Sequence, residues 1–130
     1  MSGYYRFPTI NNSKVVFVAE DDLWSVSTNN PKAFRLTTNI SEVLSPLISP
    51  NGKWIAFVGT EDGNNEVYVM PSDGGPATRL TYDGAFVSRI ACWQGDDIIF
   101  STDLSQSFGR VVSLAKINRK GGATTLLNYG

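Results

Sequence analysis

A single strand-and-turn unit recurs three times along this chain, and that recurrence restricts the possible folds more than any other feature. Phe17, Phe57 and Phe100 each lie inside an apolar run, at separations of 40 and 43 residues. Each unit also ends in a short run that begins with alanine and holds leucine three residues later: Ala33–Leu36, Ala77–Leu80 and Ala123–Leu126. Repeats of about 40 residues built only from strands are typical of the blades of a β-propeller.

The middle unit, from Ser49 to Tyr82, shows the strand pattern most clearly. Its three runs are rich in the residue types that favour strands: Lys53–Gly59, Glu66–Met70 and Ala77–Tyr82. The turns around them contain Asn51-Gly52 and Asp73-Gly74, residues that accept the positive φ of tight hairpins. This alternation of runs and turns predicts antiparallel hairpins.

We therefore predict an all-β fold, a β-propeller of three four-stranded antiparallel blades in a single partial domain over residues 1–130. Blade one covers about residues 4–37, blade two about 43–82 and blade three about 87–127. A run such as Lys14–Ala19, apolar at nearly every position, fits a blade that is covered on both faces. A β-sandwich is the alternative, but it gives no reason for one turn and strand ending to recur.

The residue types that are scarce exclude several classes of chemistry. The chain has no histidine and one cysteine, Cys92, so it can build neither a Ser-His-Asp nor a Cys-His nucleophile, nor a thiolate zinc site. It also lacks a glycine-rich phosphate-binding loop, and we expect no catalytic residue, no metal and no cofactor. The net charge of -1 indicates no general affinity for nucleic acid.

The same composition sets expectations for location. No apolar run approaches the roughly 18 residues of a membrane span, and the opening residues lack the pattern of a secretory signal. A lone cysteine excludes an internal disulfide and fits a reducing compartment. We therefore expect a cytoplasmic protein without membrane contact, although removal of a leader sequence would leave the same pattern.

Several segments resemble, in order, the amino-terminal propeller of the tricorn protease family. The opening Tyr5–Ile10, the run Val15–Val18 and the segment Asp21–Trp24 are similar to its first blade. The middle unit reads Ser-Pro-Asn-Gly-Lys-Trp-Ile-Ala-Phe and then Glu-Val-Tyr-Val-Met-Pro-Ser-Asp-Gly-Gly-Pro-Ala-Thr-Arg-Leu-Thr, which resembles the repeat shared by tricorn proteases and TolB-like proteins. The resemblance covers essentially the whole chain.

This resemblance implies the non-catalytic part of a cytoplasmic peptidase that trims short peptides. The family's amino-terminal propeller has six blades and is thought to guide peptides, so this chain would be half of a six-bladed propeller. The family's catalytic serine, histidine and glutamate lie in a distant carboxy-terminal domain, and no position here matches them. The alternatives are a TolB-like interaction propeller and a truncated fragment without a function of its own. A parent reading frame that continues into a serine-peptidase domain would support the tricorn-like interpretation over these two alternatives.

Acidic residues are expected to gather at one end of the blades. In each blade, the loop between the second and third strands shares that end with the blade-to-blade connections. These loops supply our hypothetical peptide-binding residues, with Glu20 beside them: Asp21, Asp22, Glu61, Asp62, Glu66 and Asp103. Basic residues lie at or beside the turns of the opposite end: Lys14, Lys32, Lys53, Arg119 and Lys120. An acidic mouth would favour cationic peptides, whereas the simpler interpretation is that charged loops aid solubility.

Three other features have structural interpretations. Asp96-Asp97 fits the chemistry of a turn, and Cys92 in an apolar run fits a small core residue. The three tryptophans fit the core between blades.

Three blades are too few to close a ring, because propellers have at least four. The partners we expect are peptides, the remaining propeller blades, or a second copy that joins through exposed blade faces. Two copies about a two-fold axis would complete six blades, and each junction would bury on the order of 800 Å² per partner. Open-ended stacking is the competing outcome.

Overall fold

The structure is a computed structural model that describes residues 6–37, 42–60, 64–82, 87–106 and 109–127, without the side chains of Arg6, Pro31 and 103–112. The described residues form twelve strands and no helix. Blade one consists of β1 (Arg6–Asn11), β2 (Lys14–Ala19), β3 (Asp22–Ser27) and β4 (Asn30–Arg35). Blade two consists of β5 (Val43–Ile48), β6 (Trp54–Gly59), β7 (Glu66–Pro71) and β8 (Thr78–Arg79). Blade three consists of β9 (Val87–Gln94), β10 (Asp97–Gln106), β11 (Gly109–Asn118) and β12 (Thr125–Leu126).

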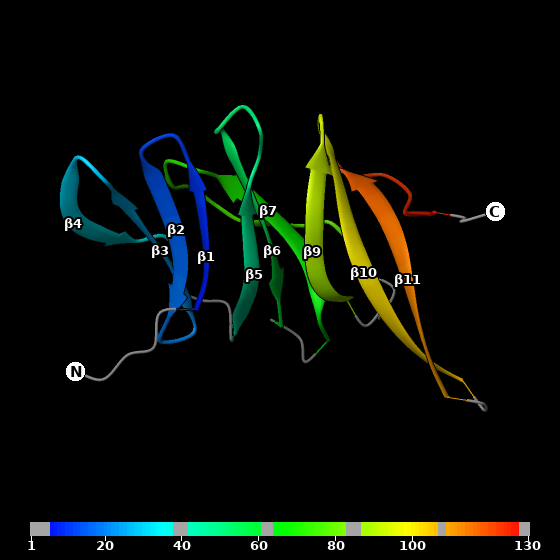
Figure 1. Ribbon diagram of the computed structural model, residues 1–130. Coiled ribbons are helices and arrows are strands. Elements are labelled where there is room, and N and C mark those ends of the chain that lie inside the picture. The colour runs from blue at the N-terminus through cyan, green and yellow to red at the C-terminus, as the bar shows by residue number, and fades with distance from the viewer. Residues whose placement is uncertain (1–5, 38–41, 61–63, 83–86, 107–108, 128–130) are drawn as a thin grey trace.

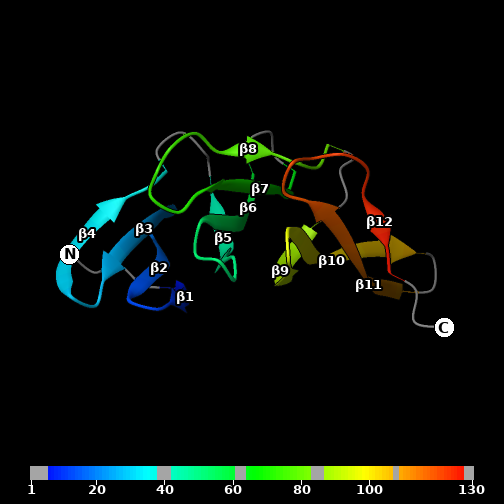
Figure 2. The same cartoon turned by 90° about the horizontal axis from the view of Figure 1, so that it is seen from above.

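Each blade is one antiparallel sheet, and the order of its strands follows the chain. The blades stand side by side in chain order, with blade one at one end of the stack and blade three at the other (Figure 1). Seen from above, β1, β5 and β9 line the concave side, whereas β4, β8 and β12 lie on the outside (Figure 2). The predicted all-β fold of three four-stranded blades is confirmed.

Strand pairing confirms that the three phenylalanines are counterparts. Each occupies the same position in the second strand of its blade, and the residue opposite it on the third strand is Trp24, Tyr68 or Ala115. Phe57 and Phe100 are fully buried, and the ring of Phe57 stacks on that of Tyr68 with centroids 5.4 Å apart. The repeat is therefore a structural one, and positions can be compared blade by blade.

The closing strands correct one detail of the repeat. The amide groups of Leu36, Leu80 and Leu127 donate to the carbonyl groups of Leu23, Val67 and Leu114 respectively, at 2.7, 2.7 and 2.9 Å. The counterpart of Leu36 and Leu80 is therefore Leu127, whereas the spacing of the sequence repeat placed Leu126 there. The spacing from alanine favours Leu126, and only the backbone pairing shows that the next leucine takes this position.

Two apolar cores lie between the blades, one on each face of blade two. Its residues that face blade one are Ile55, Phe57, Tyr68 and Met70, and those that face blade three are Ala56, Val58, Val67 and Val69. All eight are buried. At about 25 cal/mol per Å² of apolar surface, this burial supplies the main driving force for stacking the blades.

The hairpin of blade three is longer than the sequence predicted. We expected Asp103 to lie in the loop between the second and third strands, but β10 continues to Gln106 and pairs with β11 from Asp97 opposite Asn118 to Gln106 opposite Gly109. Antiparallel pairing satisfies the backbone amide and carbonyl groups of both strands, which lets polar residues extend a hairpin without an apolar core. The point at which β10 ends is therefore set by its backbone pairing with β11, which the composition of the segment does not reveal.

Candidate functional site

The two ends of the stack differ in the loops that they carry. The turn between β2 and β3 lies at the lower end in Figure 1, where β6 also ends and β7 begins. The turns between β1 and β2, β5 and β6, and β9 and β10 lie at the upper end. The sequence predicted this separation, with the loops between second and third strands at one end of the stack and the other turns at the opposite end. We call the lower end the loop end, and it is where the six peptide-binding residues are expected.

Asp21 belongs to a tight turn at the tip of the β2–β3 hairpin. Ala19 pairs with Asp22, which leaves Glu20 and Asp21 as a two-residue connection with φ values of 53° and 66°. Positive φ at both central positions is the type I′ geometry, whose twist matches that of the flanking strands. Both acidic side chains are exposed at the loop end.

Asp22, the next residue, is buried inside blade one. Its carboxylate accepts a hydrogen bond from the hydroxyl of Thr37 at 2.9 Å and pairs with the guanidinium of Arg35 at 3.1 Å. The same hydroxyl accepts from the amide of Leu23 at 3.0 Å. Asp22 therefore fastens the third strand of its blade to the segment that follows the fourth.

Glu66 repeats this arrangement in blade two. Its carboxylate is 1% exposed, accepts from the hydroxyl of Thr81 and pairs with Arg79 at 3.1 Å. The hydroxyl of Thr81 accepts from the amide of Val67 at 2.9 Å. We call these two groups the acid–arginine clamps: Asp22, Arg35 and Thr37 in blade one, and Glu66, Arg79 and Thr81 in blade two. Their carboxylates are engaged inside the blades and are not presented at the loop end.

A sequence pattern that we did not use could have predicted the clamps. In both blades an acid opens the third strand, and Arg-Leu-Thr closes the unit at Arg35–Thr37 and Arg79–Thr81. In blade three the counterpart of the acid is Ser113 and that of the arginine is Leu126. Acid and arginine are thus present together or replaced together, as a structural pair requires.

The remaining predicted residues are placed only in part. Glu61 and Asp62 lie outside the described residues, and Asp103 is described in its backbone alone, as part of β10. A further acid, which the sequence did not single out, does lie at this end: Glu42 is exposed, and its carbonyl accepts from the amide of Thr60 at 3.2 Å. The exposed acids described at the loop end are therefore Glu20, Asp21 and Glu42.

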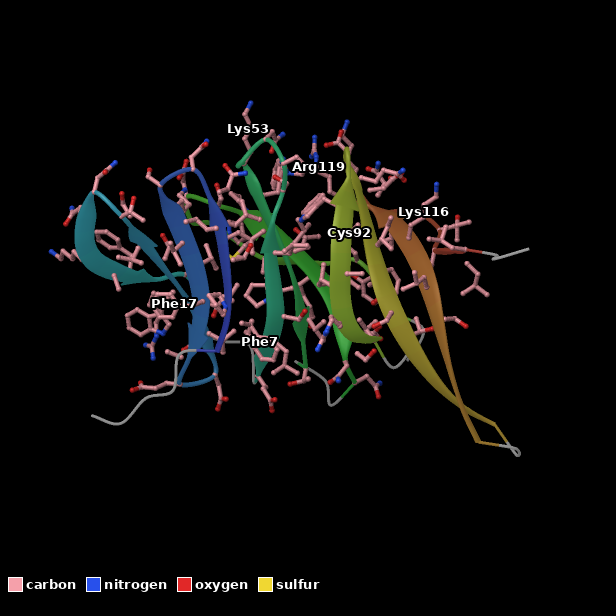
Figure 3. All side chains as sticks on the ribbon, in the orientation of Figure 1. Phe7, Phe17, Lys53, Cys92, Lys116 and Arg119 are labelled. Carbon is pink, nitrogen blue, oxygen red and sulfur yellow. The ribbon has the colours of Figure 1, made fainter. Side chains whose placement is uncertain are left out.

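The opposite end carries basic residues, several of which have acidic partners. Lys14 of blade one donates to Asp73 of blade two, and this hydrogen bond and charge lower the pKa of the Asp73 carboxyl. Arg119 pairs with Asp96 at 3.0 Å and lies over the ring of Trp54, 4.6 Å from its centroid. Lys53 and Arg119 are labelled at this end in Figure 3. Because Asp73 and Asp96 offset the charges of Lys14 and Arg119, the net positive charge of the upper end is smaller than the number of its basic residues suggests.

Cys92 is exposed, which contradicts the prediction that it is a small core residue. It lies opposite Ile99 and therefore on the face of β9 turned away from blade two, whereas the next residue, Trp93, packs on the core. The indole of Trp93 donates to the carbonyl of Leu47 at 2.9 Å and so links blade three to blade two. Trp54 packs on the same core, and Trp24 is half-buried on the far side of blade one.

No group of residues that could hold a metal ion occurs in the described part of the chain. Within the same residues, no helix has the length and hydropathy needed to cross a bilayer.

Three stacked four-stranded blades with their inner strands on a concave side define a partial β-propeller. A family model of the tricorn protease N-terminal β-propeller domain matches residues 2–130, and the chain belongs to this family. Tricorn protease homolog 1 of Streptomyces coelicolor is 35% identical over 98% of this chain and 12% of its own length. A tricorn-like protease N-terminal subunit of Sulfurisphaera tokodaii is 30% identical over 100% of this chain and 68% of its own length.

Solved structures agree on the fold. The crystal structure of the tricorn protease superposes with a TM-score of 0.83 at 22% identity, over 98% of this chain and 13% of that one. TolB from Acinetobacter baumannii superposes with a TM-score of 0.73 at 18% identity, over 95% of this chain and 32% of that one. The chain thus spans 12% of the length of the Streptomyces homolog and 13% of that of the crystallised tricorn protease.

Proposed function

We propose that this chain is the non-catalytic propeller portion of a tricorn-like serine peptidase, acting in the cytoplasm, and that it guides peptides toward a catalytic domain absent from this sequence. Family membership over residues 2–130 carries the proposal. The relative described as a tricorn-like protease N-terminal subunit supports a role for this propeller portion within such a peptidase.

The loop end is the surface that we propose meets the peptide. Glu20, Asp21 and Glu42 are exposed there, and they come from two adjacent blades. Fixed carboxylates at one end of a concave stack attract cationic groups, such as a peptide amino terminus or lysine and arginine side chains. Glu61, Asp62 and Asp103 remain part of this proposal, because Glu61 and Asp62 follow β6 in the sequence and Asp103 belongs to β10.

Binding of a lysine-rich peptide to the chain tests this role. The triple variant Glu20→Gln, Asp21→Asn and Glu42→Gln should weaken binding several-fold at low ionic strength, and salt should reduce the difference. Asn is a suitable replacement for Asp21 because it accepts positive φ. The double variant Asp73→Asn and Asp96→Asn removes charge at the opposite end and should leave affinity nearly unchanged. Equal affinity of the triple variant and the parent would overturn the proposal.

The non-catalytic part of the proposal has its own test. The chain has no histidine, so no imidazole base is available to activate a serine. The pure chain should not turn over a fluorogenic peptide. Turnover that a serine-directed reagent abolishes would contradict the assignment.

A further inference from the structure

We propose that blade one docks onto blade three of a second copy of this chain, through a junction that repeats the two junctions inside the chain. This inference concerns assembly and holds whether or not the chain guides peptides.

One position of the innermost strands shows that blade one has an unfilled junction. Ile10, Ile48 and Trp93 are counterparts, since they pair with Val15, Ile55 and Ile98 in the same register. Ile48 is 7% exposed in the core between blades one and two, and Trp93 packs on the core between blades two and three. Ile10 is 63% exposed. The residue type that fills a junction in blade two is therefore left in water in blade one.

The same comparison extends across the whole side of blade one that is turned away from blade two. We call this side the blade-one flank, and it consists of Ile10, Val15, Phe17, Trp24 and Val26. The counterparts of its last four members in blade two are Ile55, Phe57, Tyr68 and Met70, which are buried against blade one. Figure 3 labels Phe17 on this side. The flank thus has the composition of a face that packs on a neighbouring blade.

The complementary face lies at the other end of the stack. We call it the blade-three flank, and it consists of Cys92, Ile99, Ser101, Leu114 and Lys116. The counterparts of its last four members in blade two are Ala56, Val58, Val67 and Val69, which are buried against blade three. Ile99 and Leu114 keep the apolar character, whereas Ser101 and Lys116 are polar. A junction on this flank should therefore be weaker than the two built ones.

One polar contact of the junction between blades one and two also has a counterpart in blade three. At the end of β1, the amide of Asn11 donates to the carbonyls of Ser49 and Pro50 in the next blade, at 3.2 and 3.3 Å. Gln94 occupies the position of Asn11 at the end of β9 and carries the same amide group. In a repeated junction it would donate to the turn after β1 of the second copy.

A second copy is the occupant that these observations favour, because both halves of the junction are on this chain. The junction joins two different faces, so each copy offers one flank and accepts the other, and the assembly either closes into a ring or extends. Lys116 is the one charged residue among the ten that define the two flanks, and Arg35, which covers the ring of Trp24, is paired with Asp22. The area expected from a blade-sized face, on the order of 800 Å² per partner, is that of a standard interface.

Sedimentation velocity of the 130-residue chain across a concentration series tests the proposal. The parent should associate reversibly, and Ile10→Lys should weaken association at least tenfold, since a charge would enter the junction. The folded monomer tolerates this change because Ile10 is already exposed. Phe34→Lys is the matched control, because Phe34 is 56% exposed on the outermost strand of the same blade and lies outside the flank. A parent that stays monomeric at every concentration overturns the proposal, and so does equal weakening by both variants.

Complementation distinguishes a junction of two different faces from a contact between like faces. Ile10→Lys disables one flank and Leu114→Lys disables the other, so neither variant alone should associate. Their mixture should form a dimer through the two intact flanks. In addition, Lys116→Val copies Val69 and should tighten association several-fold. A mixture that stays monomeric, or a Lys116→Val variant no tighter than the parent, would contradict the assigned residues.

The lone cysteine allows a direct readout of the contact. Thr9, the counterpart of Cys92, accepts from the amide of Ile48 across the first junction at 3.4 Å. Cys92 of one copy should therefore lie beside residue 10 of the next. Under mild oxidation, Ile10→Cys should yield a disulfide between residues 10 and 92 of different copies, and Phe34→Cys should not. Peptide mapping that finds only 92–92 or 10–10 linkage would overturn the arrangement.

Discussion

The carboxylate of Glu66 lies 3.1 Å from the guanidinium of Arg79, and this pair joins the third strand of blade two to its outermost strand. Only 1% of the Glu66 side chain and 16% of that of Arg79 is exposed to water. Arg79 also donates to the carbonyl of Thr81 at 2.8 Å and covers the ring of Tyr82. The outermost strand, which is two residues long, is therefore held by side chains as much as by its ladder.

The first prediction concerns this clamp. Arg79→Leu should lower the free energy of unfolding by about 3 kcal/mol, because it leaves a buried carboxylate without its cation. The double variant Glu66→Ser and Arg79→Leu copies blade three, where Ser113 and Leu126 stand at these positions, and should cost less than the single variant. Urea denaturation of parent, single and double variants measures the coupling.

Blade one supplies the control for this prediction. Arg35 is 46% exposed in the corresponding pair, so Arg35→Leu should cost less than Arg79→Leu. Equal costs for Arg35→Leu and Arg79→Leu, or a double variant less stable than the single, would refute a role for burial in the clamp.

The second prediction concerns the turn before β6. Gly52 has a φ of +76°, and a Cβ there would lie 3.1 Å from the side-chain oxygen of Asn11. Gly52→Ala should therefore cost about 1–2 kcal/mol of strain, with a further loss from displacing Asn11, whose amide joins blade one to blade two. The measurement is chemical denaturation.

Gly95 is the matched control for Gly52. Its φ is +60°, and a Cβ would meet nothing within 4 Å, so Gly95→Ala should show the strain alone. A cost for Gly52→Ala no larger than that for Gly95→Ala would mean that the contact with Asn11 adds nothing to stability.

The architecture could be predicted from sequence because local signals repeat. Phe17, Phe57 and Phe100 mark one strand in each blade, and turn residues mark the hairpins between strands. The limits of two elements could not be predicted. The far end of β10 runs to Gln106 because it is paired with β11, and the register of β12 depends on which of two adjacent leucines donates to Leu114.

The candidate site was less predictable than the fold. The sequence indicates which acids belong to one end of the stack, but it does not separate an exposed acid from one that is enclosed. Asp21 and Asp22 are adjacent, yet Asp21 belongs to the turn and is exposed, whereas Asp22 opens β3 and its carboxylate enters the clamp. Burial of Asp22 and Glu66 depends on arginines 13 residues further along the chain.

The third prediction concerns the stacking of Arg119 on Trp54, which joins blade three to blade two. Arg119→Lys keeps the charge beside Asp96 but loses the planar group that covers the indole, 4.6 Å from its centroid. We expect a loss of about 0.5–1 kcal/mol in the free energy of unfolding. The fluorescence of Trp54 should change as well, which a background with both other tryptophans, Trp24 and Trp93, replaced can assign. An unchanged stability for Arg119→Lys would mean that the contact is made by charge alone.

The fourth prediction concerns pH and the contact between Lys14 and Asp73, which joins blade one to blade two. The hydrogen bond and charge of Lys14 lower the pKa of Asp73 below its ordinary value of 3.8. A lowered pKa in the folded state means that the contact stabilises the protein above pH 3.8 and that this contribution is lost as the pH falls through the lower, folded-state pKa. The Asp73 side chain is 92% exposed, so the contribution at neutral pH should be at most about 1 kcal/mol and should decrease with salt. Asp73→Asn should therefore be slightly less stable than the parent at pH 7, and the two should converge in acid. A difference that persists unchanged below the folded-state pKa would show that the amide acts through something other than the lost charge.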